Sequence, residues 1–229
     1  MKEAAAFAVR KLAWNTDNHK SVVCTIPHLV SLLCSGADRV KEAAADAIYP
    51  LARNKDLHAA LSDAVFPLVL MLCQGSSDRA KESAIDALGY LIADDDVKRI
   101  ITETGAINSL VALLRKSGTA GVKAAAAVAL GLLSCNCRTS QIEIAEAGAI
   151  DPLVALLYAD GFQPLAAVEA LRNLAYKNHK NAMTVGSHRG VIALLVAMQR
   201  GGVDDDTKDA ANTLLHILGS AGFMAAMQR

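Results

Sequence analysis

The chain has 229 residues, of which 53% are hydrophobic and only 4% aromatic. Basic and acidic residues number 23 each, so the formal net charge is zero, and no basic cluster of the kind that binds nucleic acid or a membrane surface is present. The longest apolar runs, 124–133 and 191–198, are far shorter than the roughly 20 residues of a membrane span. Residues 1–14 also lack the continuous apolar centre of a signal peptide. We expect a soluble, intracellular protein, with the cytoplasm favoured over the nucleus or an organelle interior.

Helical patterns follow one another along the chain. Residues 3–14, 38–52 and 162–175 predict long helices, whereas residues 95–104 and 138–147 predict shorter helices with polar starts. Gly105, Gly148 and Gly190 follow short helices, and glycine suits such turns because it adopts left-handed backbone angles without strain. We expect Asp38, Asp78 and Pro164 at the starts of long helices. Helices in between are expected to end near Gly36, Gly75, Gly118, Gly161 and Gly202.

Two independent patterns repeat with one period. Segments similar to LVALL begin at Leu29, Leu68, Leu110, Leu153 and Leu194, at spacings of 39, 42, 43 and 41 residues. A second series places Leu12, Leu51, Leu91, Leu133, Leu174 and Ile217 in register, at spacings of 39, 40, 42, 41 and 43 residues. A shared period near 41 predicts a repeat protein, in which each unit buries its apolar face against its neighbours.

Three helices in each unit, this period, and the strings AEAGAIDPLVALL and AAVEALRNLA resemble armadillo repeats. The resemblance covers essentially the whole chain. It implies an all-α fold, a right-handed superhelical solenoid of three-helix repeats whose third helices line a concave groove. HEAT repeats are the nearest alternative, but they have two helices per unit, and the separate short helices favour armadillo. We expect a single domain over residues 1–229, with partial repeats at 1–24 and 191–229 and full repeats at 25–64, 65–106, 107–149 and 150–190.

Both ends lack the polar outer face that usually caps a stack of repeats. The first helix carries Phe7 and Trp14, and residues 222–229 resemble the beginning of another repeat. We expect either a fragment of a longer solenoid or a subunit whose ends make end-to-end or assembly contacts with partners.

In the armadillo family, one asparagine on each third helix hydrogen-bonds the backbone of an extended peptide, and a tryptophan one turn earlier often packs against the peptide. The asparagine position holds Lys11, Pro50, Tyr90, Leu132, Asn173 and His216 here, so only Asn173 matches. The position four residues earlier holds Phe7, Asp46, Asp86, Val128, Glu169 and Asn212, without a tryptophan. The chain therefore departs from importin-α, and recognition of nuclear signals by that mechanism is not expected.

Side chains on this face of the third helices are the candidate partner-binding residues. They have mixed charges and include aromatic residues and arginines, which are enriched at binding hot spots. Val128 and Leu132 are expected to make the centre of the groove apolar. The alternative for each position is an ordinary solvated helix surface. The candidates are Arg10, Lys11, Trp14, Asp46, Tyr49, Arg53, Asp86, Tyr90, Glu169, Arg172, Asn173, Asn212 and His216.

The expected function is that of a scaffold or adaptor that binds a protein or peptide partner along the groove of third helices. The alternative is a structural subunit of a large multi-protein assembly, held through its surfaces and ends. An enzyme is not expected, because no serine–histidine–aspartate or cysteine–histidine arrangement is visible. No cofactor or metal ion is expected either.

Several local features have structural and functional interpretations. Pro50 predicts a kink in its helix, and the competing interpretation is a bend that frees a carbonyl for a partner. Cys34 and Cys73 are expected to be small buried residues, and Cys135 and Cys137 to be loop thiols, since a zinc site needs four ligands. Aspartate triplets at 94–96 and 204–206 are expected to cap helices, with contact to a basic partner as the alternative. His19 and His179, each in an NHK string, are expected at equivalent helix starts.

Overall fold

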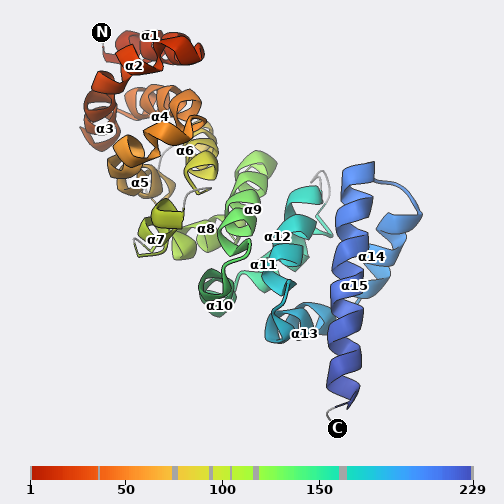
Figure 1. Ribbon diagram of the computed structural model, residues 1–229. Helices are drawn as coiled ribbons and strands as arrows, with labels where there is room; N and C mark the ends of the chain where they lie inside the picture. Colours follow the sequence, from red (N-terminus) through yellow and green to blue (C-terminus); the bar gives the residue numbers. More distant parts are fainter. Residues whose placement is uncertain are drawn as a thin grey trace. The chain divides into compact units, whose positions relative to one another are not determined.

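The structure is a computed structural model that describes residues 2–35, 37–73, 77–92, 95–103, 105–115, 119–159 and 164–227. Every regular element in these ranges is helical (Figure 1). The chain divides into two compact units, residues 1–113 and 114–229. The all-α fold expected from the sequence is therefore confirmed in the described part of the chain, whereas the division into numbered repeats of a single domain stays a prediction.

Unit 1 contains the first eight α-helices, the last of which ends just beyond it. In chain order, its elements are α1 (Lys2–Ala13), η1 (Thr16–Asn18), α2 (His19–Val22), η2 (Val23–Thr25), α3 (Ile26–Ser35), α4 (Asp38–Ala52), η3 (Lys55–Leu57), α5 (His58–Cys73), α6 (Asp78–Leu91), α7 (Asp95–Glu103) and α8 (Ala106–Arg115). Helix α4 packs between α1 and α6, so these three long helices lie side by side (Figure 1).

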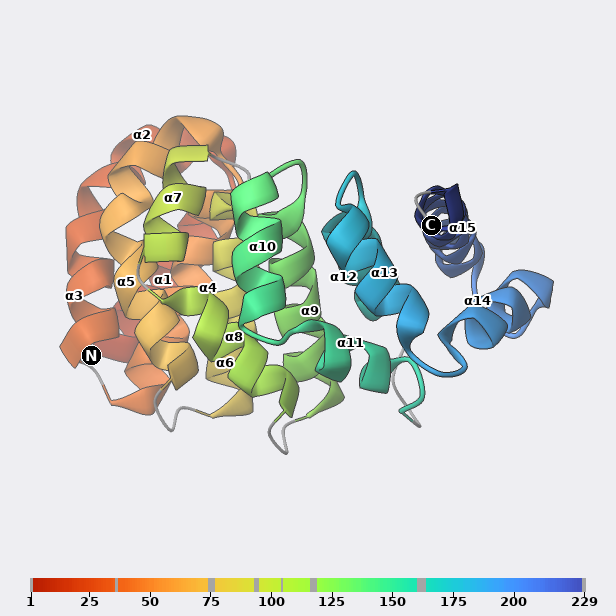
Figure 2. The same ribbon diagram turned by 90° about the horizontal axis from the view of Figure 1, so that it is seen from below.

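Unit 2 repeats the order of a short first helix, a second helix and a long third helix. Its elements are α9 (Ala120–Ser134), α10 (Arg138–Glu146), α11 (Ile150–Leu156), α12 (Leu165–Ala175), α13 (His179–Ser187), α14 (Val191–Arg200) and α15 (Asp205–Met227). The long helix α12 packs between α9 and α15. The short helices α10 and α13 lie over α9 and α12, respectively (Figure 2).

The core of each unit follows the two repeating patterns of the sequence. Leu51, Leu91, Leu133 and Leu174 are completely buried, as are many alanines of the long helices. Burying a leucine contributes roughly 1.5–3 kcal/mol, whereas alanine contributes little area but lets neighbouring helices approach closely. Leu12 belongs to the same series but is 52% exposed.

The predicted glycine turns are confirmed at the ends of the short helices. Gly105, Gly148 and Gly190 have φ angles of 75°, 76° and 86°. At Gly148 the approach of a neighbour adds a second requirement, because an added Cβ would lie 2.6 Å from Nη2 of Arg115. That same Nη2 donates a hydrogen bond to the carbonyl oxygen of Gly148 at 2.8 Å, so Arg115 at the end of α8 holds the turn that follows α10.

Two helices run further than the sequence analysis expects. Helix α5 continues from His58 to Cys73 through Pro67. A single helix therefore replaces the separate short and middle helices expected in this part of the chain. Helix α15 continues to Met227, although residues 222–229 were expected to begin another repeat. Neither proline nor a capping residue interrupts α15 near residue 222, and its glycines lower helix propensity without ending the helix.

Helix starts are capped by residues next to those expected. Asp38 and Asp78 are the first residues of α4 and α6, while Ser77 occupies the capping position and accepts a hydrogen bond from the backbone N–H of Ala80 at 3.2 Å. Asp204 caps α15 as predicted for its triplet, since its Oδ1 accepts from the N–H of Thr207 at 2.9 Å. The hydrogen bonds that Asp204 accepts from the backbone and side chain of Thr207 lower the pKa of Asp204.

Pro50 is buried within α4, and the helix continues past it to Ala52. The predicted kink stays a prediction. The expectation that Cys34 is buried is wrong, because Cys34 is exposed. Leu29 and Leu33 form the buried stripe of α3, and Cys34 lies outside the three-to-four-residue spacing that defines this stripe. The side chain of Cys73 and the ends predicted at Gly36, Gly75, Gly118 and Gly161 lie outside the described residues.

Candidate functional site

The candidate residues all lie on the long third helices or directly after them, and all are at least partly accessible to solvent. In unit 1 they are Arg10 and Lys11 on α1, Trp14 after it, Asp46 and Tyr49 on α4, Arg53 after it, and Asp86 and Tyr90 on α6. In unit 2 they are Glu169, Arg172 and Asn173 on α12, and Asn212 and His216 on α15.

Four candidate residues of unit 1 form one aromatic cluster, which consists of Trp14, Tyr49, Tyr90 and Arg53. The Trp14 and Tyr49 rings have their centroids 5.8 Å apart, and the Tyr49 and Tyr90 rings are 5.5 Å apart in an edge-to-face arrangement. The guanidinium carbon of Arg53 lies 5.4 Å from the Trp14 ring and 6.0 Å from the Tyr90 ring. Aromatic pairs and cation–π contacts of this kind contribute about 0.5–1.5 kcal/mol each.

The aromatic cluster is preorganised but not covered. Tyr49 holds its centre, and the pKa of Tyr49 is raised by burial, by a hydrogen bond with Tyr90, and by the negative charge of Asp86. Trp14 is 47% exposed and Tyr90 is 41% exposed. Two large ring surfaces are therefore held in place by neighbours while still facing solvent.

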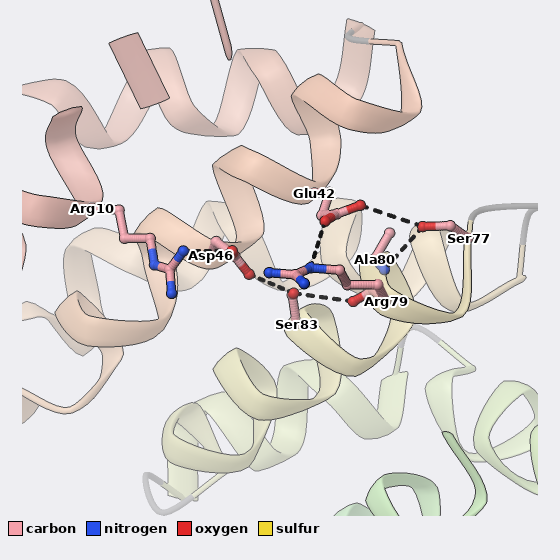
Figure 3. A network of polar contacts seen from close by, with 7 residues as sticks. All are labelled: Arg10, Glu42, Asp46, Ser77, Arg79, Ala80 and Ser83. Carbon is pink, nitrogen blue, oxygen red and sulfur yellow. Dashed lines mark hydrogen bonds and ion pairs between the residues drawn. The ribbon is translucent and has the colours of Figure 1, made fainter. Parts of the chain in front are cut away.

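A polar network joins the same three helices beside the cluster (Figure 3). Nη1 of Arg10 on α1 lies 3.1 Å from Oδ2 of Asp46 on α4. The other oxygen of Asp46 accepts a hydrogen bond from the hydroxyl of Ser83 on α6. Further along the same helices, Nε of Arg79 lies 2.8 Å from Oε1 of Glu42. The Asp46 carboxylate is thus fully engaged in linking three third helices.

Asp86 differs from Asp46 although both occupy the same repeat position. In the described part of the chain, Asp86 has no ion-pair partner. Its pKa is raised by burial first and then by the negative charges of Glu82 and Asp46. The face of unit 1 therefore carries the ion-paired carboxylate of Asp46 and the carboxylate of Asp86, whose negative charge is disfavoured by its surroundings.

The sequence analysis missed residues of this face that lie closer to the helix starts. A pocket of about 660 Å³ includes Phe7, Glu42 and Arg79 together with Arg10 and Asp46. Lys11 places its Nζ 5.4 Å from the Phe7 ring. Glu42 lies four residues before Asp46, so the helical spacing of neighbouring side chains could have identified it.

In unit 2 the candidate residues do not form one cluster. Arg172 pairs with Glu169 on the same helix, with 3.5 Å between Nη2 and Oε1. Asn212 accepts a hydrogen bond from Nε2 of Gln199 at 2.6 Å. His216 instead lines a pocket beside the end of α12. Val128 and Leu132 are 43% and 38% exposed, which agrees with the apolar surface expected from them.

Asn173 makes a contact within the repeat stack. Its Nδ2 donates a hydrogen bond to the carbonyl oxygen of Gly131 on α9 at 3.1 Å. Gly131 lets the two helices approach, because an added Cβ would lie 3.2 Å from Cα of Ala170 on α12. One donor of the amide is therefore used between helices, and a single asparagine cannot act as a row of peptide-binding side chains.

A second interhelical bridge involves Gln141, which the sequence analysis missed. Its Nε2 donates to the carbonyl oxygens of Asn173 and Tyr176 at 2.9 and 3.0 Å, and so caps the C-terminal end of α12. Asn181 donates to the carbonyl oxygen of Leu174 at 3.0 Å. These side chains are buried and are not available to a ligand.

His19 and His179 are the first residues of α2 and α13, so the expected helix starts are confirmed, but their side chains lie in different surroundings. His19 is buried and its Nε2 lies 2.8 Å from the carbonyl oxygen of Ala13, whereas His179 is exposed. The structural equivalent of His19 is His58, whose Nε2 lies 2.7 Å from the carbonyl oxygen of Ala52. His19 and His58 each lie six residues after the last residue of a third helix, and the NHK string gives no information about that spacing.

Two searches over the described residues bear on other kinds of site. No group of three or more histidine, cysteine, aspartate or glutamate side chains is placed to hold a metal ion there. Within the same part of the chain, no helix combines the length and apolar character needed to cross a membrane. Cys135 directly follows α9 and Cys137 directly precedes α10; both are partly buried and neither forms a disulfide.

The sequence matches no protein-family model and no curated protein. Solved structures do match. An engineered protein from a structural genomics consortium is 25% identical, with a TM-score of 0.86 over 95% of this chain and 92% of that chain. A structure described as computationally designed armadillo repeat proteins for modular peptide recognition is 25% identical, with a TM-score of 0.81 over 93% of this chain and 92% of that chain.

A third match is a designed armadillo repeat protein in complex with the peptide (KR)4. It is 23% identical, with a TM-score of 0.82 over 94% of this chain and 92% of that chain. These likenesses extend over nearly the full length of the compared chains, and they agree with the repeat period, the glycine turns and the third helices described above. The chain therefore has the armadillo-repeat fold.

Proposed function

We propose that the protein is an interaction scaffold or adaptor that binds a protein partner along the faces of its third helices, and that the aromatic cluster is its main anchor. The observation that carries this proposal is the exposure of Trp14 and Tyr90 on either side of Arg53. Tryptophan, tyrosine and arginine dominate binding hot spots, and side chains that are already ordered lose little entropy on binding. A binding role also suits the likeness to a protein designed for peptide recognition.

Mixed charge on the third-helix face favours a protein partner over nucleic acid, because basic side chains such as Arg10 and Arg79 are paired with carboxylates. We propose an intracellular site of action, since Cys24, Cys34, Cys135 and Cys137 form no disulfide. We propose no catalytic role.

Affinity purification at moderate salt, followed by identification of the bound proteins, tests the proposal. The bait is the 229-residue chain in three forms: the original, the Arg53→Ala/Tyr90→Ala variant, and the Phe66→Ala variant. Phe66 is a matched control, because it is an aromatic residue of unit 1 that is 57% exposed but lies on α5. We expect the double variant to bind the isolated partner about tenfold more weakly and the control to bind it normally. Equal binding by all three forms would show that the cluster is not the anchor.

A second function is favoured by Leu12. This residue is 52% exposed at a position where Leu51, Leu91 and Leu174 are completely buried. An apolar side chain left uncovered in one repeat suits a contact with another subunit, as in the structural component of a large assembly. Co-purification in a fixed stoichiometry that Leu12→Ser abolishes, while Arg53→Ala/Tyr90→Ala does not, would support this function over the adaptor.

A further inference from the structure

A pocket of about 540 Å³ lies in unit 2 between the end of α12, the start of α13 and the C-terminal half of α15. Figure 1 shows α13 beside this half of α15. Ala175, Ala182, Ile217 and Ala221 provide an apolar lining. His216 is the only residue of this pocket among the candidates identified from sequence.

The polar side chains of the pocket are basic or neutral. Lys177, His179 and His216 line it, and all three are exposed. No aspartate or glutamate is among its lining residues, which all belong to the described part of the chain. An apolar surface with three basic side chains and no compensating carboxylate favours an acidic ligand with an apolar body.

The basic side chain at the mouth of this pocket is held in place. Lys177 has a φ angle of 53°, which is uncommon for a residue other than glycine. Nη1 of Arg138 donates to its carbonyl oxygen at 2.6 Å and so fixes the turn from the neighbouring repeat. The Nζ of Lys177 lies 5.1 Å from the ring of Tyr176, which is 42% exposed. The cation and the aromatic ring are therefore positioned before any ligand binds.

A related arrangement occurs after a third helix of unit 1, although the cation there comes from the next third helix and not from the same loop. There, a pocket of about 400 Å³ is lined by Trp14 after α1 and by Pro50 and Arg53 from the next third helix. A cation again lies over the exposed ring, with 5.4 Å between Arg53 and Trp14. No acidic residue lines this pocket among the described residues. An exposed aromatic ring with a cation over it therefore lines a pocket after a third helix in both units.

We propose that the pocket formed by Tyr176, Lys177, His179 and His216 binds an acidic side chain of an extended protein partner, with a neighbouring apolar residue of that partner against Ile217 and Ala221. This inference rests on the proposed function of the chain as a protein-binding scaffold, because it names the chemistry of one part of the partner. It assigns an anion-binding role to the loop after one third helix together with His216, which occupies the asparagine position of the next third helix.

The test uses fluorescence anisotropy with a labelled peptide, GSLEELEGS, and its neutral counterpart, GSLQQLQGS. We expect the 229-residue chain to bind the acidic peptide and to bind the neutral peptide at least tenfold more weakly. Lys177→Gln/His216→Gln should reduce affinity for the acidic peptide about tenfold, since each exposed pairing is worth about a factor of five or less. Lys180→Gln/Lys208→Gln is the matched control, because both lysines belong to unit 2 and neither lines the pocket.

Any of the following outcomes would overturn the inference. Equal affinity for the two peptides would remove the role of charge, and equal loss in the control variant would reduce it to nonspecific attraction. If inorganic phosphate at millimolar concentration binds while the acidic peptide does not, the pocket is a small-anion site. Dimerisation of the chain that Lys177→Gln/His216→Gln abolishes would identify a second copy as the occupant.

The proposed function can fail separately. If Arg53→Ala/Tyr90→Ala leaves capture of the natural partner intact, the anchor in unit 1 is wrong, yet binding of the acidic peptide to unit 2 still decides this inference. The two measurements use different residues in different units.

Discussion

The side-chain amide of Asn173 donates a hydrogen bond to the carbonyl oxygen of Gly131, 3.1 Å away, and thereby links the third helices α12 and α9. The hydroxyl of Ser134 donates to the same oxygen at 2.9 Å. Asn173 is the one match to the asparagine position of peptide-binding armadillo repeats, and it serves at least partly to hold adjacent repeats together.

Asn173→Ala should lower the free energy of unfolding by about 0.5–1 kcal/mol, because one partly buried hydrogen bond is lost while Ser134 still satisfies the Gly131 carbonyl. Urea unfolding followed by helical circular dichroism measures this change. A variant with unchanged stability and abolished binding to the natural partner would instead make Asn173 a ligand-binding residue.

Gly131→Ala should destabilise unit 2 by about 1 kcal/mol. The new Cβ would lie 3.2 Å from Cα of Ala170, so α9 and α12 must separate slightly, and this cost exceeds the gain in helix propensity. Gly219→Ala on α15 is the matched control, because no atom lies within 4 Å of its new Cβ. The control should raise stability by up to about 1 kcal/mol, and equal shifts in the two variants would refute close packing at Gly131.

Asp86→Asn should stabilise the protein at pH 7. Burial and the charges of Glu82 and Asp46 raise the pKa of Asp86 above the ordinary aspartate value of 3.8. The folded chain then binds more protons than the unfolded chain just above pH 3.8, so the free energy of unfolding falls as pH rises through this window and stays lower above it. The neutral asparagine avoids that loss, and the advantage should disappear near pH 3.

Asp46→Asn provides the comparison for Asp86→Asn. It should destabilise the protein at pH 7 by about 1 kcal/mol, because the pairing of Asp46 with Arg10 is weakened and its contact with Ser83 is altered. Melting temperatures of both variants at pH 7 and pH 3 test the contrast. Shifts of the same sign at pH 7 would contradict it.

His58→Ala should lower the free energy of unfolding by about 1–3 kcal/mol, because the carbonyl oxygen of Ala52 at the end of α4 loses a buried partner. His179→Ala should change stability little, since His179 is exposed. Equal losses in the two variants would show that the contact of His58 with Ala52 contributes nothing beyond what an exposed histidine contributes.

Local patterns predicted most of the helices and their turns. The 15-residue pattern at 38–52 corresponds to α4, and Gly148 and Gly190 have the left-handed angles expected of them. The series that includes Leu51 and Leu174 is buried as a repeat core requires. The position of the third-helix face was also predictable, because helical periodicity places residues three and four apart on the same side.

Local patterns failed where a residue's role depends on the neighbouring repeat. Gln141 caps the end of α12, 32 and 35 residues away in sequence, and no spacing within its own helix indicates this. Asp46 and Asp86 occupy the same repeat position, but their carboxylates differ. Asp46 forms an ion pair with Arg10 from the preceding third helix, whereas Asp86 has no ion-pair partner in the described part of the chain. His19, His58 and His179 each begin a helix, yet His19 and His58 contact the last carbonyl oxygen of the preceding third helix, whereas His179 is exposed.

By itself, the sequence determined the repeat period, the helices and the side chains that each helix buries, because backbone propensity and apolar spacing act over a few residues. Only the tertiary structure decided that Asn173 bonds to Gly131, that Arg53 lies between Trp14 and Tyr90, and which carboxylates are paired. These relationships join helices about 40 residues apart. They depend on how closely and at what angle the helices pack, which the apolar pattern permits without specifying.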